Sequence, residues 1–153
     1  MFSDEYSSQR EEEISFVMLH FSSNVVANPT NPYDAQKVID TFLNYGVSAH
    51  YLIDRDGTVY HLVDESTATW HAGKGTWDNN EKYTDRMNHY SIGIEILGIG
   101  SYEDMSQYLT KEQYNLIKKR TLAIRTSSMK VFLIYLKILM ISMKIFRLIA
   151  NIL

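Results

Sequence analysis

The sequence contains no cysteine. This absence excludes disulfide bonds, thiolate ligands for zinc and a cysteine nucleophile. Glycine and proline are unevenly placed, because all 7 glycines and both prolines lie at or before Gly100. After Glu112 the sequence also has no Asp, Glu or His. The acidic and imidazole groups that could bind a metal or act in catalysis therefore all lie within residues 1–112.

Charge is distributed unevenly along the chain. Residues 1–113 hold 7 Lys and Arg against all 18 Asp and Glu, whereas residues 114–153 hold the other 8 Lys and Arg. The formal net charge is only −3, so no basic excess points to nucleic acid as a partner. The start, MFSDEYSSQREEE, has neither the basic nor the apolar region of a secretory signal. We expect a cytoplasmic protein, with the cell envelope as the alternative.

A length of 153 residues predicts one domain, whose strands can be read from the hydrophobic pattern. Residues 1–13 are polar and are expected to form a flexible lead-in. Apolar, β-branched runs predict strands at residues 14–21 and 91–98. Two further runs flank the turn sequence DRDG (54–57) and predict a hairpin, with glycine free to take a positive φ.

Two helices are predicted between and after these strands. One is expected to begin at the segment NPYD, with Asn31 as the cap, and to end at Gly46. The other begins at a capping box formed by Thr110 and Gln113. Residues 64–90 read as a long polar loop, and loops of that length usually carry function. This order indicates an α/β, or mixed α+β, fold with a central mixed β-sheet flanked by helices.

Glu95 lies in the middle of the apolar strand segment SIGIEILG. A carboxylate there is unfavourable unless it is paired or points into a cleft. Gly93 lies on the same strand face and leaves room beside the carboxylate for a ligand. The pattern fits a general base, and a glutamate on a solvated sheet face is the alternative.

The histidines differ in the strength of their signals. His20 ends a predicted strand, a common position for ligands at the rim of a sheet, although such a histidine is often only half-buried. His50 lies on a predicted core-side strand and could equally be a satisfied core histidine. His61 and His89 are expected to have no role in the site. No pair has the HExxH spacing of a zinc helix, so a metal site would have to be assembled from distant segments.

The segment TWHAGKGTW combines a histidine, two tryptophans and two glycines. Glycine allows a ligand to approach closely, and the flat apolar face of tryptophan suits a sugar ring. Trp70 and His71 are therefore candidate binding residues, with plain packing aromatics as the alternative.

Taken in order, FVMLHFSS, VSAHYLIDRDGTVYHLVDE, TWHAGKGTW and SIGIEILG resemble the zinc-dependent N-acetylmuramoyl-L-alanine amidases of the amidase-2 type. Relatives of that family include the T7-type lysozymes and the peptidoglycan recognition proteins. The resemblance covers residues 14–124. It implies a bacterial cell-wall hydrolase that cleaves the amide between N-acetylmuramic acid and L-Ala in peptidoglycan or muropeptides. It also implies that His20 is a zinc ligand, that Glu95 is the catalytic base, and that His50, Trp70 and His71 line the substrate site.

The sequence departs from the family pattern after the last predicted helix. There the family carries its other two zinc ligands, in a stretch resembling GHxxIAPGRKxDPG, and this sequence has no such stretch. Catalytic zinc generally takes three protein ligands, so zinc binding here would need substitute donors, of which His50, His71 and Asp85 are candidates. We expect an impaired amidase whose fold is incomplete at the C-terminus. A non-catalytic module that binds muropeptide is the alternative.

Residues 125–153 form an apolar, basic tail that does not match the family. Six isoleucines recur in it at helical spacing: Ile134, Ile138, Ile141, Ile145, Ile149 and Ile152. One interpretation is a helix at a membrane surface over residues 129–153. A spanning helix is disfavoured, because Lys137, Lys144 and Arg147 interrupt the apolar run. The third interpretation is a change of reading frame near Arg125.

Overall fold

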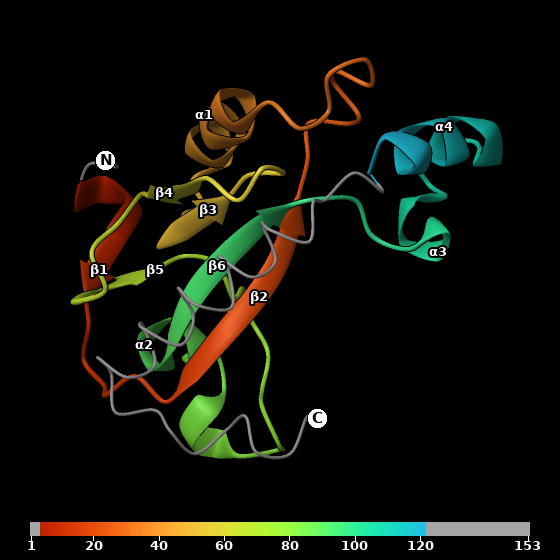
Figure 1. Cartoon of the computed structure of the whole chain (residues 1–153). Coiled ribbons are helices and arrows are strands. Elements are labelled where there is room, and N and C mark those ends of the chain that lie inside the picture. The colour runs from red at the N-terminus through yellow and green to blue at the C-terminus, as the bar shows by residue number, and fades with distance from the viewer. Residues whose placement is uncertain (1–3, 122–153) are drawn as a thin grey trace.

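The computed structural model of the chain describes residues 4–121 and is built around a four-stranded sheet (Figure 1). Its strands are β2 (Phe16–Ser22), β6 (Ser91–Leu97), β3 (Tyr51–Ile53) and β4 (Val59–His61), in the order β2-β6-β3-β4. β6 pairs in parallel with β2 and with β3, whereas β3 and β4 are antiparallel. The predicted mixed sheet is confirmed.

β6 is the central long strand, and its two faces are packed differently. On one face Ile92 and Ile94 pack with Tyr51 and Ile53 of β3. On the other face Leu97 joins Leu52 and the buried residues of the first α-helix. Burial on both faces explains why the strand is so apolar. It also means that Gly93 and Glu95, which share the face of Leu97, lie on the side of the sheet that the first helix covers.

That helix, α1 (Ala35–Tyr45), begins later than the sequence predicts. The expected cap was Asn31, but Asp34 is the N-cap, because its carboxylate accepts a hydrogen bond from the Lys37 N–H at 3.1 Å. The predicted end is confirmed: Gly46 takes the left-handed conformation, with φ of 66°, and closes the helix. Val38 and Phe42 bury the apolar stripe of α1 against the sheet.

The predicted hairpin is confirmed. The N–H of Asp54 donates to the Thr58 carbonyl at 2.9 Å, and the N–H of Gly57 donates to the Asp54 carbonyl at 3.1 Å. Gly57 has φ of 92°, a conformation that side chains disfavour. The turn sets the register in which Leu52 faces Tyr60 across the two strands.

The N-terminal segment differs from the flexible lead-in predicted for residues 1–13. Asp4–Tyr6 form a short 3-10 helix (η1), and β1 (Ser7–Gln9) pairs antiparallel with β5 (Thr67–Thr69). The prediction failed because three polar residues give no strand signal of their own. Their partner lies nearly 60 residues away, inside the stretch read as a polar loop.

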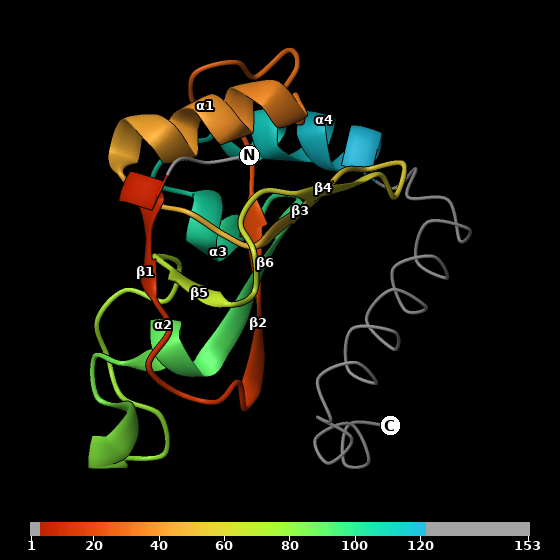
Figure 2. The ribbon, with the colours of Figure 1, turned by 90° about the vertical axis from the view of Figure 1, so that its left-hand side faces the viewer.

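The remaining helices lie at the two ends of β2 and β6 (Figures 1 and 2). α2 (Met87–Tyr90) and η2 (Glu81–Tyr83) lie where β6 begins, whereas α3 (Tyr102–Met105) and α4 (Lys111–Thr121) lie beyond its end. The predicted capping box of α4 is confirmed: the Thr110 N–H donates to Gln113 at 2.9 Å and the Gln113 N–H donates to Thr110 at 3.3 Å.

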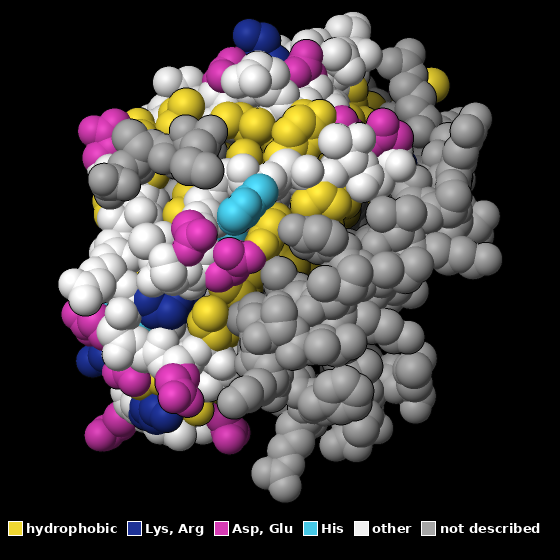
Figure 3. Space-filling model, turned by 60° about the vertical axis from the view of Figure 1, so that its left-hand side comes forward, with side chains coloured by type: hydrophobic (Ala, Val, Ile, Leu, Met, Phe, Trp, Pro, Cys, Tyr) yellow, Lys and Arg dark blue, Asp and Glu magenta, His cyan; other side chains and the backbone are white. Residues whose placement is uncertain are grey.

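The tail predicted for residues 125–153 lies outside the described residues. Within residues 4–121, no helix has the length and hydropathy needed to cross a membrane. Acidic side chains are spread over the face drawn in Figure 3, in line with the excess of Asp and Glu in residues 1–113.

Candidate active site

His20 and Glu95 lie directly opposite each other on neighbouring strands. The parallel register of β2 and β6 pairs them, and on the other side of β6 the register pairs Glu95 with Leu52. Both His20 and Glu95 are half-buried. Side chains of paired residues project from the same face of a sheet. The structure therefore brings together the two residues that the resemblance assigns to metal and to catalysis.

The Glu95 carboxylate is anchored by a hydroxyl from the neighbouring strand. Ser22 Oγ donates a hydrogen bond of 2.6 Å to Glu95 Oε2. Ser22 follows His20 by two residues, so strand periodicity places it on the same face. A half-buried carboxylate held in this way has a fixed orientation while it still reaches solvent.

His71 lies beside His20 and is linked to it. The Nε2 atom of His20 is 3.1 Å from Nδ1 of His71, and Nε2 of His71 is 3.2 Å from Ser91 Oγ. Ser91 uses its own proton to donate to the Met87 carbonyl at 2.6 Å, so Ser91 accepts from His71 Nε2–H. His71 Nδ1 must then accept from His20 Nε2–H. This series of hydrogen bonds places the proton of each imidazole, His20 and His71, on its Nε2 atom.

The ring of His71 covers Gly93. A Cβ atom added at Gly93 would lie 2.4 Å from His71 Cγ, so only glycine fits beneath the ring. We expected Gly93 to leave room for a ligand next to Glu95, and this interpretation is wrong because the imidazole fills that space. Burial, and after it the nearby His20, His50 and Arg10, lowers the pKa of His71 from 6.5 to about 3. His71 is therefore neutral at pH 7.

His50 is a core residue, with no part of its side chain exposed. Its Nδ1 accepts from the Gly93 N–H and the Thr69 hydroxyl, each at 3.0 Å, so its proton is on Nε2 and is donated to the Thr67 carbonyl at 3.1 Å. Burial lowers the pKa of His50 from 6.5 to about 4. Of the two readings of His50, the structure favours the satisfied core histidine. A direct contact with substrate would require these bonds to break.

Trp70 is the most exposed of the three candidate binding residues, with 39% of its surface exposed, whereas His71 is half-buried and His50 is fully buried. The N–H of Trp70 donates to Ser48 Oγ at 2.9 Å, and its carbonyl accepts from the Ser48 N–H at 3.2 Å. The backbone of Trp70 is thus fixed while part of the residue reaches solvent. By contrast, the ring of His61 stacks on that of Tyr51, with 4.9 Å between the ring centroids, on the sheet face opposite to Glu95.

Three further residues shape this site and were not identified from the sequence: Arg10, Ser22 and Asn88. Asn88 Oδ1 accepts from the backbone N–H groups of His71 and Ala72 at 3.2 and 2.8 Å. Strand periodicity could have indicated Ser22. Arg10 and Asn88 carry no such local signal, because their partners lie far away in the sequence.

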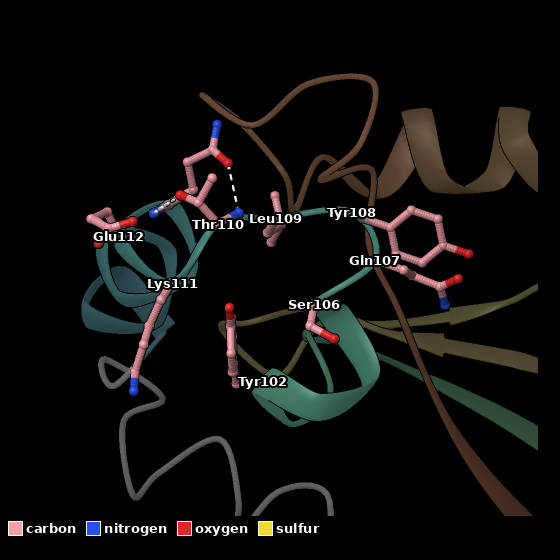
Figure 4. Close-up of a pocket in the computed structure, with 9 residues that line it drawn as sticks. Tyr102, Ser106, Gln107, Tyr108, Leu109, Thr110, Lys111 and Glu112 are labelled. Carbon is pink, nitrogen blue, oxygen red and sulfur yellow. Dashed lines mark hydrogen bonds between the residues drawn. The ribbon is translucent and has the colours of Figure 1, made fainter.

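A separate hollow lies between α3 and α4 (Figure 4). It is lined by Tyr102 and residues 106–113, which include the capping pair of α4. None of these residues belongs to the sheet face of Glu95. The hollow is therefore not part of the candidate active site.

Residues 10–130 match the family described as N-acetylmuramoyl-L-alanine amidase (Amidase_2). The chain belongs to this family. It is 35% identical over 75 residues to the 1,6-anhydro-N-acetylmuramyl-L-alanine amidase AmpD of Haemophilus influenzae, covering 48% of this chain and 39% of that protein. It is 44% identical over 52 residues to AmpD of Citrobacter freundii, covering 34% of this chain and 26% of that protein. The chain thus spans well under half the length of these curated relatives.

Among solved structures, the crystal structure of a selenomethionine AmpD derivative is similar to this chain. The two are 26% identical, with 74% of this chain and 70% of the other covered and a TM-score of 0.43. The amidase-2 family is generally zinc-dependent.

The residues that the structure describes do not by themselves fit a zinc site. Within residues 4–121, no three His, Cys, Asp or Glu side chains come together as a group that could hold a metal. His20 and His71 supply two nitrogens at most, and His71 Nδ1 is already engaged. Asp85, one of the candidate substitutes, accepts a hydrogen bond from the Gly75 N–H at 2.8 Å within its own loop. Two donors are fewer than the three that catalytic zinc generally takes from a protein.

Proposed function

We propose that this chain acts as an N-acetylmuramoyl-L-alanine amidase on peptidoglycan-derived muropeptides. The bond cleaved is the amide between N-acetylmuramic acid and L-Ala. One observation carries the proposal: the carboxylate of Glu95, oriented by Ser22, lies opposite His20 on a shared sheet face. Membership of the amidase-2 family and the amidase activity for which the AmpD relatives are named support the same reaction.

Glu95 is the general base and acid of this proposal. Hydrolysis of an amide needs a proton removed from the attacking water and a proton delivered to the leaving nitrogen. The Glu95 carboxylate takes the first proton as the water oxygen bonds to the carbonyl carbon. It gives that proton to the amine as the C–N bond breaks, so the carboxylate is regenerated. The described residues do not provide a complete zinc site, so no step is assigned to the metal.

The roles of the other candidates follow from their positions. Trp70 offers the exposed aromatic face on which a sugar ring can stack. His71 orients His20 through the 3.1 Å contact, and His50 supports the backbone of Gly93 from within the core. In this proposal the family site is built in two layers, with His20, Glu95 and Trp70 facing the ligand and His71 and His50 behind them.

A second function, binding of muropeptide without cleavage, is favoured by the small number of metal-binding side chains. The described residues bring no third metal donor to His20, and the sequence has no Asp, Glu, His or Cys after Glu112. The sheet face and Trp70 would still recognise the sugar and the first amino acid. The two functions share one site and differ in whether the amide is broken.

One assay separates the two functions. The purified chain is incubated with an N-acetylmuramoyl peptide, with and without added zinc, and peptide beginning with L-Ala is quantified. Release that is lost in His20→Ala and Glu95→Gln, but kept in His61→Ala, supports hydrolysis, and the comparison with and without zinc shows whether the metal takes part. Saturable binding without release supports the binding module. If the chain neither releases peptide nor binds the substrate, both proposed functions are overturned.

A further inference from the structure

Arg10, the residue directly after β1, is held in a cage of backbone carbonyls. A guanidinium has five N–H donors. Arg10 donates to five carbonyl oxygens: Nε to Glu65 at 2.9 Å, Nη1 to Asn88 at 3.3 Å and His89 at 2.5 Å, and Nη2 to Thr67 at 2.6 Å and Ser91 at 3.2 Å. The number of acceptors equals the number of donors. The cage therefore suits the planar fork of arginine, which lysine, with three donors on a single nitrogen, does not reproduce.

The five carbonyls come from both sides of one loop. Two belong to residues 65–67, before the loop, and three belong to residues 88–91, after it. The loop between them, residues 70–87, carries Trp70 and His71. Arg10 thus joins the two ends of the loop at its base. The N-terminal segment reaches this position because β1 pairs with β5, immediately before the loop.

The base of the loop is coupled to His71 by short contacts. Asn88, whose carbonyl accepts from Arg10, uses its side-chain oxygen to accept from the N–H groups of His71 and Ala72. Ser91, whose carbonyl also accepts from Arg10, holds His71 Nε2 with its hydroxyl. Displacing the carbonyls of Asn88 and Ser91 would therefore displace both the backbone and the ring of His71.

Arg10 also lies close to His50, but the two side chains do not hold each other in place. Arg10 Nη2 lies 3.0 Å from His50 Nε2. Both hydrogens of Nη2 are directed to carbonyls, and the Nε2 proton of His50 is donated to Thr67, so this contact is a close approach of two donors. Arg10 is thus held by the loop base, and His50 contributes nothing to its retention.

We propose that Arg10 is a positioning residue of the site, which fixes the base of loop 70–87 so that His71 stays over Gly93 and in contact with His20. The importance of this position for muropeptide recognition rests on the proposed function. The mechanical coupling between Arg10 and His71 does not, and it can be measured without any ligand.

The test uses the full chain with Arg10→Lys and Arg10→Ala. Arg86→Ala is the matched control, because Arg86 is an exposed arginine of the same loop that pairs with Glu11 and Glu12 at 3.3 and 2.7 Å and touches none of the five carbonyls. We expect amide hydrogen exchange at His71 and Ala72 to accelerate in both Arg10 variants and not in the control. Affinity for an N-acetylmuramoyl dipeptide should fall about 10-fold to 100-fold, the effect expected of a misplaced binding group.

Chemical rescue distinguishes positioning from general destabilisation. Guanidinium chloride at millimolar concentration should refill the cage in Arg10→Ala and restore slow exchange at His71 and Ala72. Sodium chloride at the same ionic strength should not. A variant that is merely less stable would not be restored by guanidinium, because millimolar denaturant has almost no effect on stability and never favours folding. Unchanged exchange in the Arg10 variants, or an equal effect of Arg86→Ala, would overturn the proposal.

Two further outcomes keep the test decisive. If Arg10→Ala does not fold, amide hydrogen exchange is measured on the unaltered chain instead. His71 and Ala72 should then exchange in the same slow group as the β1–β5 amides, and much faster exchange at His71 would overturn the coupling. If exchange responds as expected but no variant, nor the unaltered chain, binds the dipeptide, then the proposed function fails while the positioning role stands.

Discussion

The Nε2 atom of His20 lies 3.1 Å from the Nδ1 atom of His71, although 51 residues separate them in the chain. This contact joins the residue that the resemblance assigns to the metal to the loop whose two ends both accept hydrogen bonds from Arg10. It depends on a ring that rests on Gly93, where a side chain has no room. The geometry of the site is therefore decided by packing beneath His71 as well as by the groups that face solvent.

Gly93→Ala should displace the His71 ring and lower the free energy of unfolding by about 1–3 kcal/mol, the usual cost of overpacking. The new Cβ would meet three ring atoms of His71 at 2.4 to 2.7 Å. Urea denaturation measures this loss. Gly98→Ala is the matched control, because the nearest atom to its added Cβ is 3.8 Å away.

A double variant tests the cause of that loss. In a His71→Ala background the ring is absent, so Gly93→Ala should then cost little, and the two changes should be strongly non-additive. Additive effects would mean that Gly93 is needed for a reason other than the His71 ring.

Stability should fall as the solution becomes more acidic than about pH 6.5. The folded chain lowers the pKa of His50 to about 4 and that of His71 to about 3, whereas unfolded histidine titrates near 6.5. Between these values the unfolded state binds more protons, so stability rises with pH in this window and is lost as pH falls through it. Denaturation at several pH values measures the slope.

Nuclear magnetic resonance checks the same assignment directly. The ring signals of His50 and His71 should not titrate between pH 8 and about pH 5, because their folded pKa values lie below that range. A midpoint near 6.5 for either ring would contradict the buried, neutral imidazoles.

Much of the fold could be predicted from local patterns, and the exceptions share one physical cause. β2, β6 and the DRDG hairpin follow from alternating or continuous apolar runs, and the α4 capping box follows from Thr110 and Gln113. β1 was missed because SSQ becomes a strand only by pairing with β5. The start of α1 was misplaced because Asn31 and Asp34 are both good caps, and the carboxylate of Asp34 is the one that reaches the Lys37 N–H.

The residues of the candidate site also divide into those that a local sequence pattern indicates and those that it does not. His20 and Glu95 can be identified from the sequence, because each is a polar residue in an otherwise apolar strand segment. Arg10 cannot, since a polar lead-in with one arginine is unremarkable until its five carbonyl partners are known. We expected open space above Gly93 from the neighbouring residues alone. This expectation was wrong because the ring of His71, which belongs to a distant loop, fills that space.

Removing the hydroxyl that orients Glu95 should slow hydrolysis under the proposed function. Ser22→Ala deletes the 2.6 Å hydrogen bond to Glu95 Oε2. A hydrogen bond to a charged group is worth about 1.5–3 kcal/mol, which corresponds to a rate loss of about 10-fold to 100-fold. Release of L-Ala-terminated peptide is the measurement, and Ser23→Ala, at the position just after β2, is the control. An equal loss in both variants would assign the effect to the strand end instead of to the hydroxyl.

If residues 129–153 act at a membrane surface, one of the interpretations of the tail, the chain should bind to anionic membranes. The lysines of the tail recur at helical spacing among isoleucines, and each basic residue near a negatively charged surface contributes about 1 kcal/mol. The double variant Lys137→Glu, Lys144→Glu keeps the length and the isoleucines but reverses two charges. We expect flotation with phosphatidylserine vesicles to fall sharply in this variant, and flotation with neutral vesicles to be weak for both chains. Equal flotation of both chains with anionic vesicles would mean that apolar adsorption alone accounts for the interaction, and the charge pattern would then have no role in it.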